Sequence, residues 1–178
     1  MLLDEKITEE DLPYTEEENR QGKQKQLALR DIYHIGYRSP SALEMIDQAL
    51  EENPSLMIVD IRYTPTSRNP AWTQDTLQER YQNHYTWLRD LGNINHHADR
   101  PIQLADPNSG ITQFMHLLQQ HSLIILCGCP EYETCHRKHV IELYEQKQLA
   151  FDPEKKFWPT IRNLQDVIKP VTPPADCK

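Results

Sequence analysis

Two uninterrupted apolar runs, at residues 56–59 and 123–126, constrain the fold of this chain more than any other feature. A strand that is apolar at every position is buried on both faces, and such strands are typical of parallel sheets covered by helices on both sides. The second run, extended by Cys127, is far shorter than the roughly 20 apolar residues that cross a bilayer. The runs therefore predict an α/β fold and no membrane association.

Helical and extended patterns alternate around these two runs, which favours a single α/β domain with a mainly parallel sheet flanked by helices on both faces. We expect this domain to span residues 31–168, between a polar N-terminal arm at 1–30 and a loose C-terminal tail at 169–178. Further strands are predicted at 31–35 and 85–88. Helices are predicted from the N-cap Ser39 with Pro40, over 73–82, around 114–121, and after the N-cap Thr134. No regular element is assigned to 151–168, and 92–108 is either a functional loop or hides a short element.

The charge balance is acidic, with 19 Lys and Arg against 27 Asp and Glu and a formal net charge of −8. This excess of negative charge argues against general binding to nucleic acid, whose backbone is itself an anion. The N-terminus has no apolar signal core, so we expect a cytoplasmic protein. The sequence leaves the oligomeric state open.

Polar residues directly follow several of the predicted strands. Because parallel strands place their carboxyl ends at one edge of the sheet, we expect these residues to meet there, where α/β proteins bind ligands. They are Arg38 and Ser39 after the first strand, Asp60, Arg62, Ser67 and Arg68 after the second, and Cys127, Cys135, His136 and Arg137 around the last loop.

Cys135 lies at the predicted start of a helix. The positive end of a helix dipole and the neighbours His136 and Arg137 favour a thiolate there, and the same groups suit a small anion. We expect this first turn to open onto a pocket, because His136 and Arg137 are hard to bury beside it without a ligand. The alternative is a capped helix start with a buried, inert thiol.

The cysteine spacing also suggests a metal. Cys127, Cys129, Cys135, His136 and His139 offer three sulfurs and two imidazoles, and zinc accepts four such ligands. Cys135 and His139 are four residues apart, so they share a face of the predicted helix. Paired Cys-x2-Cys knuckles are absent, and Cys127 ends a buried strand. We therefore predict no bound zinc and no other cofactor, with zinc as the alternative.

Several motifs occur in a fixed order along the chain. They are IGYRS at 35–39, VDIR at 59–62 with PTSR at 65–68, YTWLRDLG at 85–92, and Cys127 followed eight residues later by Cys135-His136-Arg137. With these motifs the chain resembles the domain-of-unknown-function family DUF488, including its YeaO-like members, over roughly residues 31–148. The resemblance implies a single α/β domain and supplies no substrate. Two positions depart from the family pattern: Cys129 stands where an acidic residue is common, and Asn93 replaces the second glycine of a Leu-Gly-Gly.

Two functions fit these residues. The first is an enzyme that acts on a small anionic or nucleotide-like ligand at the sheet edge. The second is a non-enzymatic module that binds zinc or senses oxidants through its thiols. For the enzyme, the predicted catalytic residues are Cys135, His136 and Asp60, and the predicted ligand-binding residues are Arg38, Ser39, Arg62, Ser67, Arg68, Cys127 and Arg137.

Overall fold

A five-stranded, all-parallel sheet forms the centre of the computed structural model, which describes residues 30–96, 100–154 and 158–168. The expected tail at 169–178 and all but Arg30 of the expected arm lie outside the described residues. The sheet and the single α/β domain confirm the predicted fold class. The strands, in their order across the sheet, are β3 (Tyr85–Trp87), β2 (Leu56–Asp60), β4 (Ser122–Cys127), β1 (Ile32–Gly36) and β5 (Ile161–Asn163).

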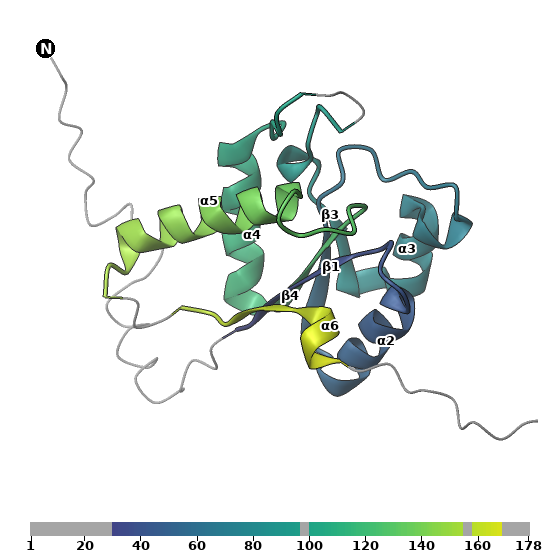
Figure 1. The fold of residues 1–178 in the computed structure, drawn as a ribbon. Coiled ribbons are helices and arrows are strands. Elements are labelled where there is room, and N and C mark those ends of the chain that lie inside the picture. Colours follow the sequence, from purple (N-terminus) through teal and green to yellow (C-terminus); the bar gives the residue numbers. More distant parts are fainter. Residues whose placement is uncertain (1–29, 97–99, 155–157, 169–178) are drawn as a thin grey trace, which may run out of the picture.

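Helices cover both faces of the sheet (Figure 1). Side chains of β2 and β4 alternate between two apolar cores, because successive residues of a strand point to opposite faces. Met57 and Ile125 enter the core under one pair of helices, whereas Ile58 and Ile124 enter the other. The first core is covered by α4 (Pro107–Gln120) and α5 (His136–Phe151), and the second by α2 (Ala42–Glu52), α3 (Gln74–Tyr81) and α6 (Leu164–Val167).

The predicted start of the first helix is wrong. Helix α2 begins at Ala42, and its N-cap is Ser41, which adopts a left-handed backbone (φ 56°) and makes no side-chain capping bond. Ser39 instead belongs to a turn, in which its N–H donates to the Gly36 carbonyl at 2.9 Å. This turn follows the end of β1 and delays the start of the helix by two residues. The helix predicted over 73–82 is confirmed, with Thr73 as the N-cap of α3.

The region from 158 to 168 contains two elements that the sequence pattern does not predict. Strand β5 is three residues long and pairs in parallel with β1, and α6 follows directly. This short edge strand has no apolar run, since it reads Ile161-Arg162-Asn163. Its backbone pairs with β1, and Ile161 packs against the core under α4 and α5. The predicted strand at 85–88 is confirmed as β3 (Tyr85–Trp87).

The stretch from 92 to 108 contains both a loop and hidden structure. Asn93 forms an isolated antiparallel bridge with Leu104, and α4 begins at Pro107 behind the N-cap Asp106. The Asp106 side chain accepts a hydrogen bond from the Ser109 N–H at 3.1 Å. The bridge between Asn93 and Leu104 therefore holds the two ends of this loop together.

The chain leaves β1 and β4 in opposite directions. From β1 it runs through α2 to β2, and from β4 it runs through α5 to β5, on the other side of β1. The carboxyl ends of two neighbouring strands, β1 and β4, therefore form the topological switch point, which is where open α/β sheets most often bind ligands.

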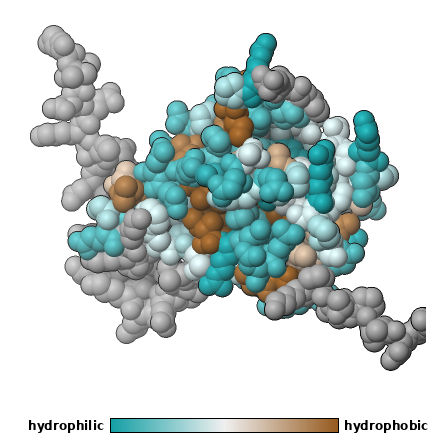
Figure 2. All heavy atoms as spheres, in the orientation of Figure 1, coloured by the Kyte–Doolittle hydropathy of each residue, from teal (hydrophilic) through white to brown (hydrophobic). Residues whose placement is uncertain are grey.

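Hydrophilic residues predominate on the face of the molecule shown in Figure 2, and hydrophobic residues appear there in separate areas. Among the described residues, the large hydrophobic side chains that remain exposed are Ile94, Leu149, Phe151 and Val167. No helix in the described part of the chain has the length and apolar character needed to cross a membrane.

Gly36 gives a test of how tightly the switch point is packed. A Cβ at this position would lie 2.0 Å from the carbonyl oxygen of Cys129, which is backbone and cannot swing away. We expect Gly36→Ala to lower the free energy of unfolding by about 1–3 kcal/mol, as overpacking does elsewhere. Urea denaturation measures the change. Gly128→Ala is the control, because its Cβ would approach only the Tyr37 ring, at 3.0 Å. Equal stability of the two variants would contradict the prediction.

Candidate metal and thiol site

Four potential metal ligands meet at the carboxyl end of β4. Cys127 is the last residue of the strand, Cys129 follows in the loop, and Cys135 and His136 begin α5. One ligand atom from each of these residues lies within 4.8 Å of each of the others. The sequence predicted only that residues of this loop lie at one edge of the sheet, and the fold brings these four side chains into one cluster.

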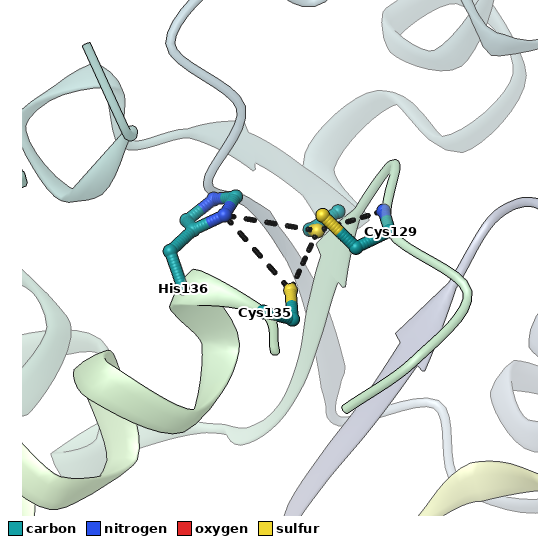
Figure 3. Close-up of side chains that lie close together, drawn as sticks. Cys129, Cys135 and His136 are labelled. Atoms are coloured by element: carbon teal, nitrogen blue, oxygen red, sulfur yellow. Dashed lines mark hydrogen bonds between the residues drawn. The ribbon is translucent and has the colours of Figure 1, made fainter. Parts of the chain in front are cut away.

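The sulfurs and the imidazole point toward a common centre (Figure 3). The Sγ atoms of Cys127 and Cys135 are 3.1 Å apart. Each of these two sulfurs is 3.9 Å from Nδ1 of His136. Cys127, Cys135 and His136 are buried and Cys129 is half-buried, so the cluster reaches the surface on the side of Cys129.

The orientation of His136 is fixed by a backbone carbonyl. Its Nε2–H donates to the carbonyl oxygen of Ile61 at 2.9 Å, so Nδ1 is the nitrogen that faces the sulfurs. Burial lowers the pKa of His136, but the interactions with Cys129 and Cys135 outweigh burial and raise the pKa to about 9. Ile61 follows β2 directly, and this bond therefore ties the cluster to a second strand.

Cys135 is itself the N-cap of α5, and the prediction that Thr134 caps this helix is wrong. Its Sγ accepts hydrogen bonds from the backbone N–H of Arg137 at 3.4 Å and from Nε of Arg137 at 3.3 Å. Hydrogen bonds with Cys127 and Cys129 lower the pKa of the Cys135 thiol, against the opposing effect of burial. Interactions with Cys129 and Cys135, together with burial, raise the pKa of Cys127.

The prediction that this helix start opens onto a pocket is also wrong for Cys135. The Cys135 side chain is fully buried, and His136 and Arg137 are only 6% and 2% exposed. The guanidinium of Arg137 lies along the cluster, where its Nη2 donates to the Cys129 carbonyl at 2.9 Å. A buried cation beside three cysteines needs negative charge nearby, because an unpaired buried charge costs several kcal/mol.

Asp60 and Arg62 form a separate, buried ion pair. The Asp60 carboxylate accepts hydrogen bonds from Nε and Nη2 of Arg62 and, at 2.8 Å, from the Tyr85 hydroxyl. The Nη1 of Arg62 donates to the Trp72 carbonyl at 2.7 Å. These groups lie at the predicted edge of the sheet, next to Ile61, but their hydrogen bonds are made to one another and to the Trp72 backbone.

The other predicted ligand-binding residues lie in two places. Ser67 and Arg68 are in the partly exposed loop before the short helix η2 (Pro70–Trp72), where the Ser67 hydroxyl accepts from the Asn69 N–H at 3.2 Å. Arg38 and Ser39 line a cavity of about 390 Å³ at the switch point. The full lining of this cavity is Arg38, Ser39, Pro40, Pro130, Glu131, Tyr132, Glu133, Arg137, Asn163 and Gln165.

His34 on β1 is a residue of this region that sequence reasoning missed. Its ring stacks on Tyr132 with the centroids 4.2 Å apart. Its Nδ1 is buried and has no hydrogen-bond partner among the described residues. Burial, with the nearby charge of Arg137, lowers the pKa of His34 to about 4. The sequence around His34 does not show that Tyr132 and Arg137, from another part of the chain, lie beside its ring.

Comparison with known proteins identifies the family. The sequence pattern described as domain of unknown function DUF488 matches residues 41–144, which is more than half of the 178 residues. The chain belongs to the DUF488 family. The DUF488 match includes α2 and both halves of the cluster, from Cys127 to Arg137, and ends before β5. A search of curated proteins and a search of solved structures each gave no match.

The buried ion pair gives a stability test. We expect Asp60→Asn to lower the free energy of unfolding by about 3–5 kcal/mol, because it leaves the Arg62 charge buried without its partner. Glu133→Gln is the matched control. Glu133 pairs with Lys138 at the surface, and we expect its loss to cost at most about 1 kcal/mol. Urea denaturation of both variants measures the difference, and a similarly small cost for both would show that Arg62 is not dependent on Asp60.

Proposed function

We propose that this DUF488 domain binds one zinc ion through Cys127, Cys129, Cys135 and His136. The observation that carries the proposal is the mutual approach of the four ligand atoms within 4.8 Å. In a tetrahedral site with Zn–S bonds of about 2.3 Å, neighbouring sulfurs are about 3.8 Å apart. The 3.9 Å from each of the Cys127 and Cys135 sulfurs to Nδ1 of His136 is close to that spacing. The two sulfurs, 3.1 Å apart, would separate by about 0.7 Å to bind the same ion.

The surroundings of the cluster suit metal-bound thiolates. Three thiolates and Zn²⁺ carry a net charge of −1, and the buried guanidinium of Arg137 offsets it. Backbone donors also point at the sulfurs, since the Cys129 N–H lies 3.1 Å from Sγ of Cys127. The bond from His136 to the Ile61 carbonyl is the outer-shell contact that orients most metal-binding histidines.

Three cysteines and one histidine fill all four positions of a tetrahedral zinc ion, which is typical of a structural rather than a catalytic site. Zinc would then join the end of β4 to the first turn of α5. Such a site needs reduced thiols, which a reducing compartment would maintain. The proposal is therefore a non-enzymatic module whose metal stabilises the fold.

This proposal reverses the sequence-based expectation that no zinc is bound. That expectation depended on the missing Cys-x2-Cys knuckles and on the position of Cys127 at the end of a buried strand. The argument that His136 and Arg137 are hard to bury without a ligand now supports a metal, because both side chains are buried.

Metal analysis tests the proposal. We expect about one zinc per chain after loading under a reductant and dialysis, and visible absorption bands of tetrahedral thiolate-bound Co²⁺ when cobalt replaces zinc. Cys129→Ser should lose most of the zinc or bind it far more weakly. Cys177→Ser is the control, because Cys177 is remote in sequence from the cluster, and it should retain full zinc. A wild-type protein that holds no zinc after loading would overturn the proposal.

A small anionic ligand at the switch point is the second candidate function. The observation that favours it is the cavity of about 390 Å³ between the loops that leave β1 and β4, into which Arg38 and Arg137 face. Glu131 and Glu133 also line this cavity, and Lys138 offsets the charge of Glu133 at 2.6 Å. The two arginines of the lining therefore face one further carboxylate, that of Glu131. The reactive groups of such an enzyme would be Cys135 and His136, which are buried next to Arg137 and do not themselves line the cavity. Arg62 and Asp60 are paired with each other, so Arg38 and Arg137 would hold the anion.

Titration with inorganic phosphate and with a nucleoside monophosphate, followed by NMR shifts, tests this second function. We expect Arg38→Ala to weaken binding by about tenfold or more, the usual cost of losing a hydrogen bond to a charged group. Arg68→Ala removes an exposed arginine that does not line the cavity and should leave binding unchanged. Absence of binding by the wild-type protein, or equal loss in both variants, would exclude the anion site.

A further inference from the structure

The closest pair of sulfurs in the cluster suggests a redox reaction. The Sγ atoms of Cys127 and Cys135 are 3.1 Å apart, between the roughly 2.05 Å of a disulfide and the roughly 3.8 Å of two ligands of one zinc ion. The two sulfurs would have to approach by about 1 Å to form a disulfide bond. Cys127 is the last residue of β4, and Cys135 is the N-cap of α5.

We infer that a peroxide oxidises the Cys127–Cys135 pair to a disulfide and that this reaction releases the zinc ion. The inference rests on the proposed zinc site, because the oxidation would regulate whether that site holds zinc. Cys129 is the half-buried member of the cluster, so the oxidant approaches from its side. The Cys129 thiol itself remains reduced after the Cys127–Cys135 disulfide has formed.

The reaction balances with the peroxide as the only oxidant. The Cys135 sulfur attacks one peroxide oxygen, the O–O bond breaks, and water leaves with a sulfenic acid on Cys135. The Cys127 sulfur then attacks the Cys135 sulfur, the S–O bond breaks, and hydroxide leaves and takes a proton to form a second water. Two thiols lose two electrons, and hydrogen peroxide gains them. Disulfide sulfurs are no longer thiolates, so zinc loses two of its four ligands and only Cys129 and His136 remain.

The shortest sulfur–sulfur contact favours Cys127 as the partner of Cys135. Cys127 is held at the end of β4, where it pairs with Gly36 of β1, and Arg137 donates to Cys135 within the first turn of α5. Cys129 lies in the loop between them, with its carbonyl bonded to Arg137 at 2.9 Å and its sulfur within 4.8 Å of the other ligand atoms. A disulfide with Cys129 is therefore the competing outcome.

The experiment starts from zinc-loaded, full-length protein in a Cys177→Ser background. Hydrogen peroxide is added while a chromophoric indicator follows free zinc, and mass spectrometry without reduction follows the loss of two hydrogens per chain. We expect zinc release and disulfide formation to proceed together, and dithiothreitol with added zinc to restore the metal.

Two matched variants identify the pair. Cys129→Ser leaves Cys127 with Cys135, and Cys127→Ser leaves Cys129 with Cys135. We expect the first to form its disulfide several-fold faster than the second, and this comparison needs no bound metal. Equal or reversed rates, or oxidation of wild type to sulfinic acid with no disulfide, would overturn the redox inference and leave the zinc site standing. If loaded wild type carries no zinc, the zinc site and its release are both overturned.

Discussion

The approach of the last residue of β4 to the first turn of α5 is the contact on which the rest of this site depends. It sets Cys127 beside Cys135, with their sulfurs 3.1 Å apart, inside a fully buried part of the molecule. Arg137 then follows in the same turn and donates both to Cys135 and to the Cys129 carbonyl. The strand, the loop and the helix are therefore joined through one group of polar atoms.

This polar group must be neutralised, because it lies in a low-dielectric interior. A guanidinium, an imidazole and two thiols are buried beside the half-buried Cys129, and burial of an unpaired charge would cost several kcal/mol. The proposed zinc ion, held by three thiolates, would balance the charge of Arg137. The bond from His136 to the carbonyl after β2 extends the same network across the sheet, toward the Asp60–Arg62 pair.

The cluster and the cavity at the switch point share Arg137. One side of its guanidinium contacts sulfur and the other lines the space between the loops of β1 and β4. A metal that fixes the start of α5 would also fix this wall of the cavity. A structural metal and a ligand-binding cavity are thus compatible in one small domain, and the residues expected at the sheet edge divide between them.

The sequence by itself determined the fold class, because two all-apolar runs require strands buried on both faces. It also determined that Asp60, Cys127 and Arg137 stand near one edge, since each follows a strand or opens a helix. Only the tertiary structure decided which of these residues touch. Spacing along the chain did not show that Arg62 turns back onto Asp60, that Cys135 rather than Thr134 caps α5, or that β5 adds to the sheet, because those outcomes depend on atoms from other elements. The tertiary structure also decided that Cys135, His136 and Arg137 are buried, because α5 packs over the end of β4 and excludes water from them.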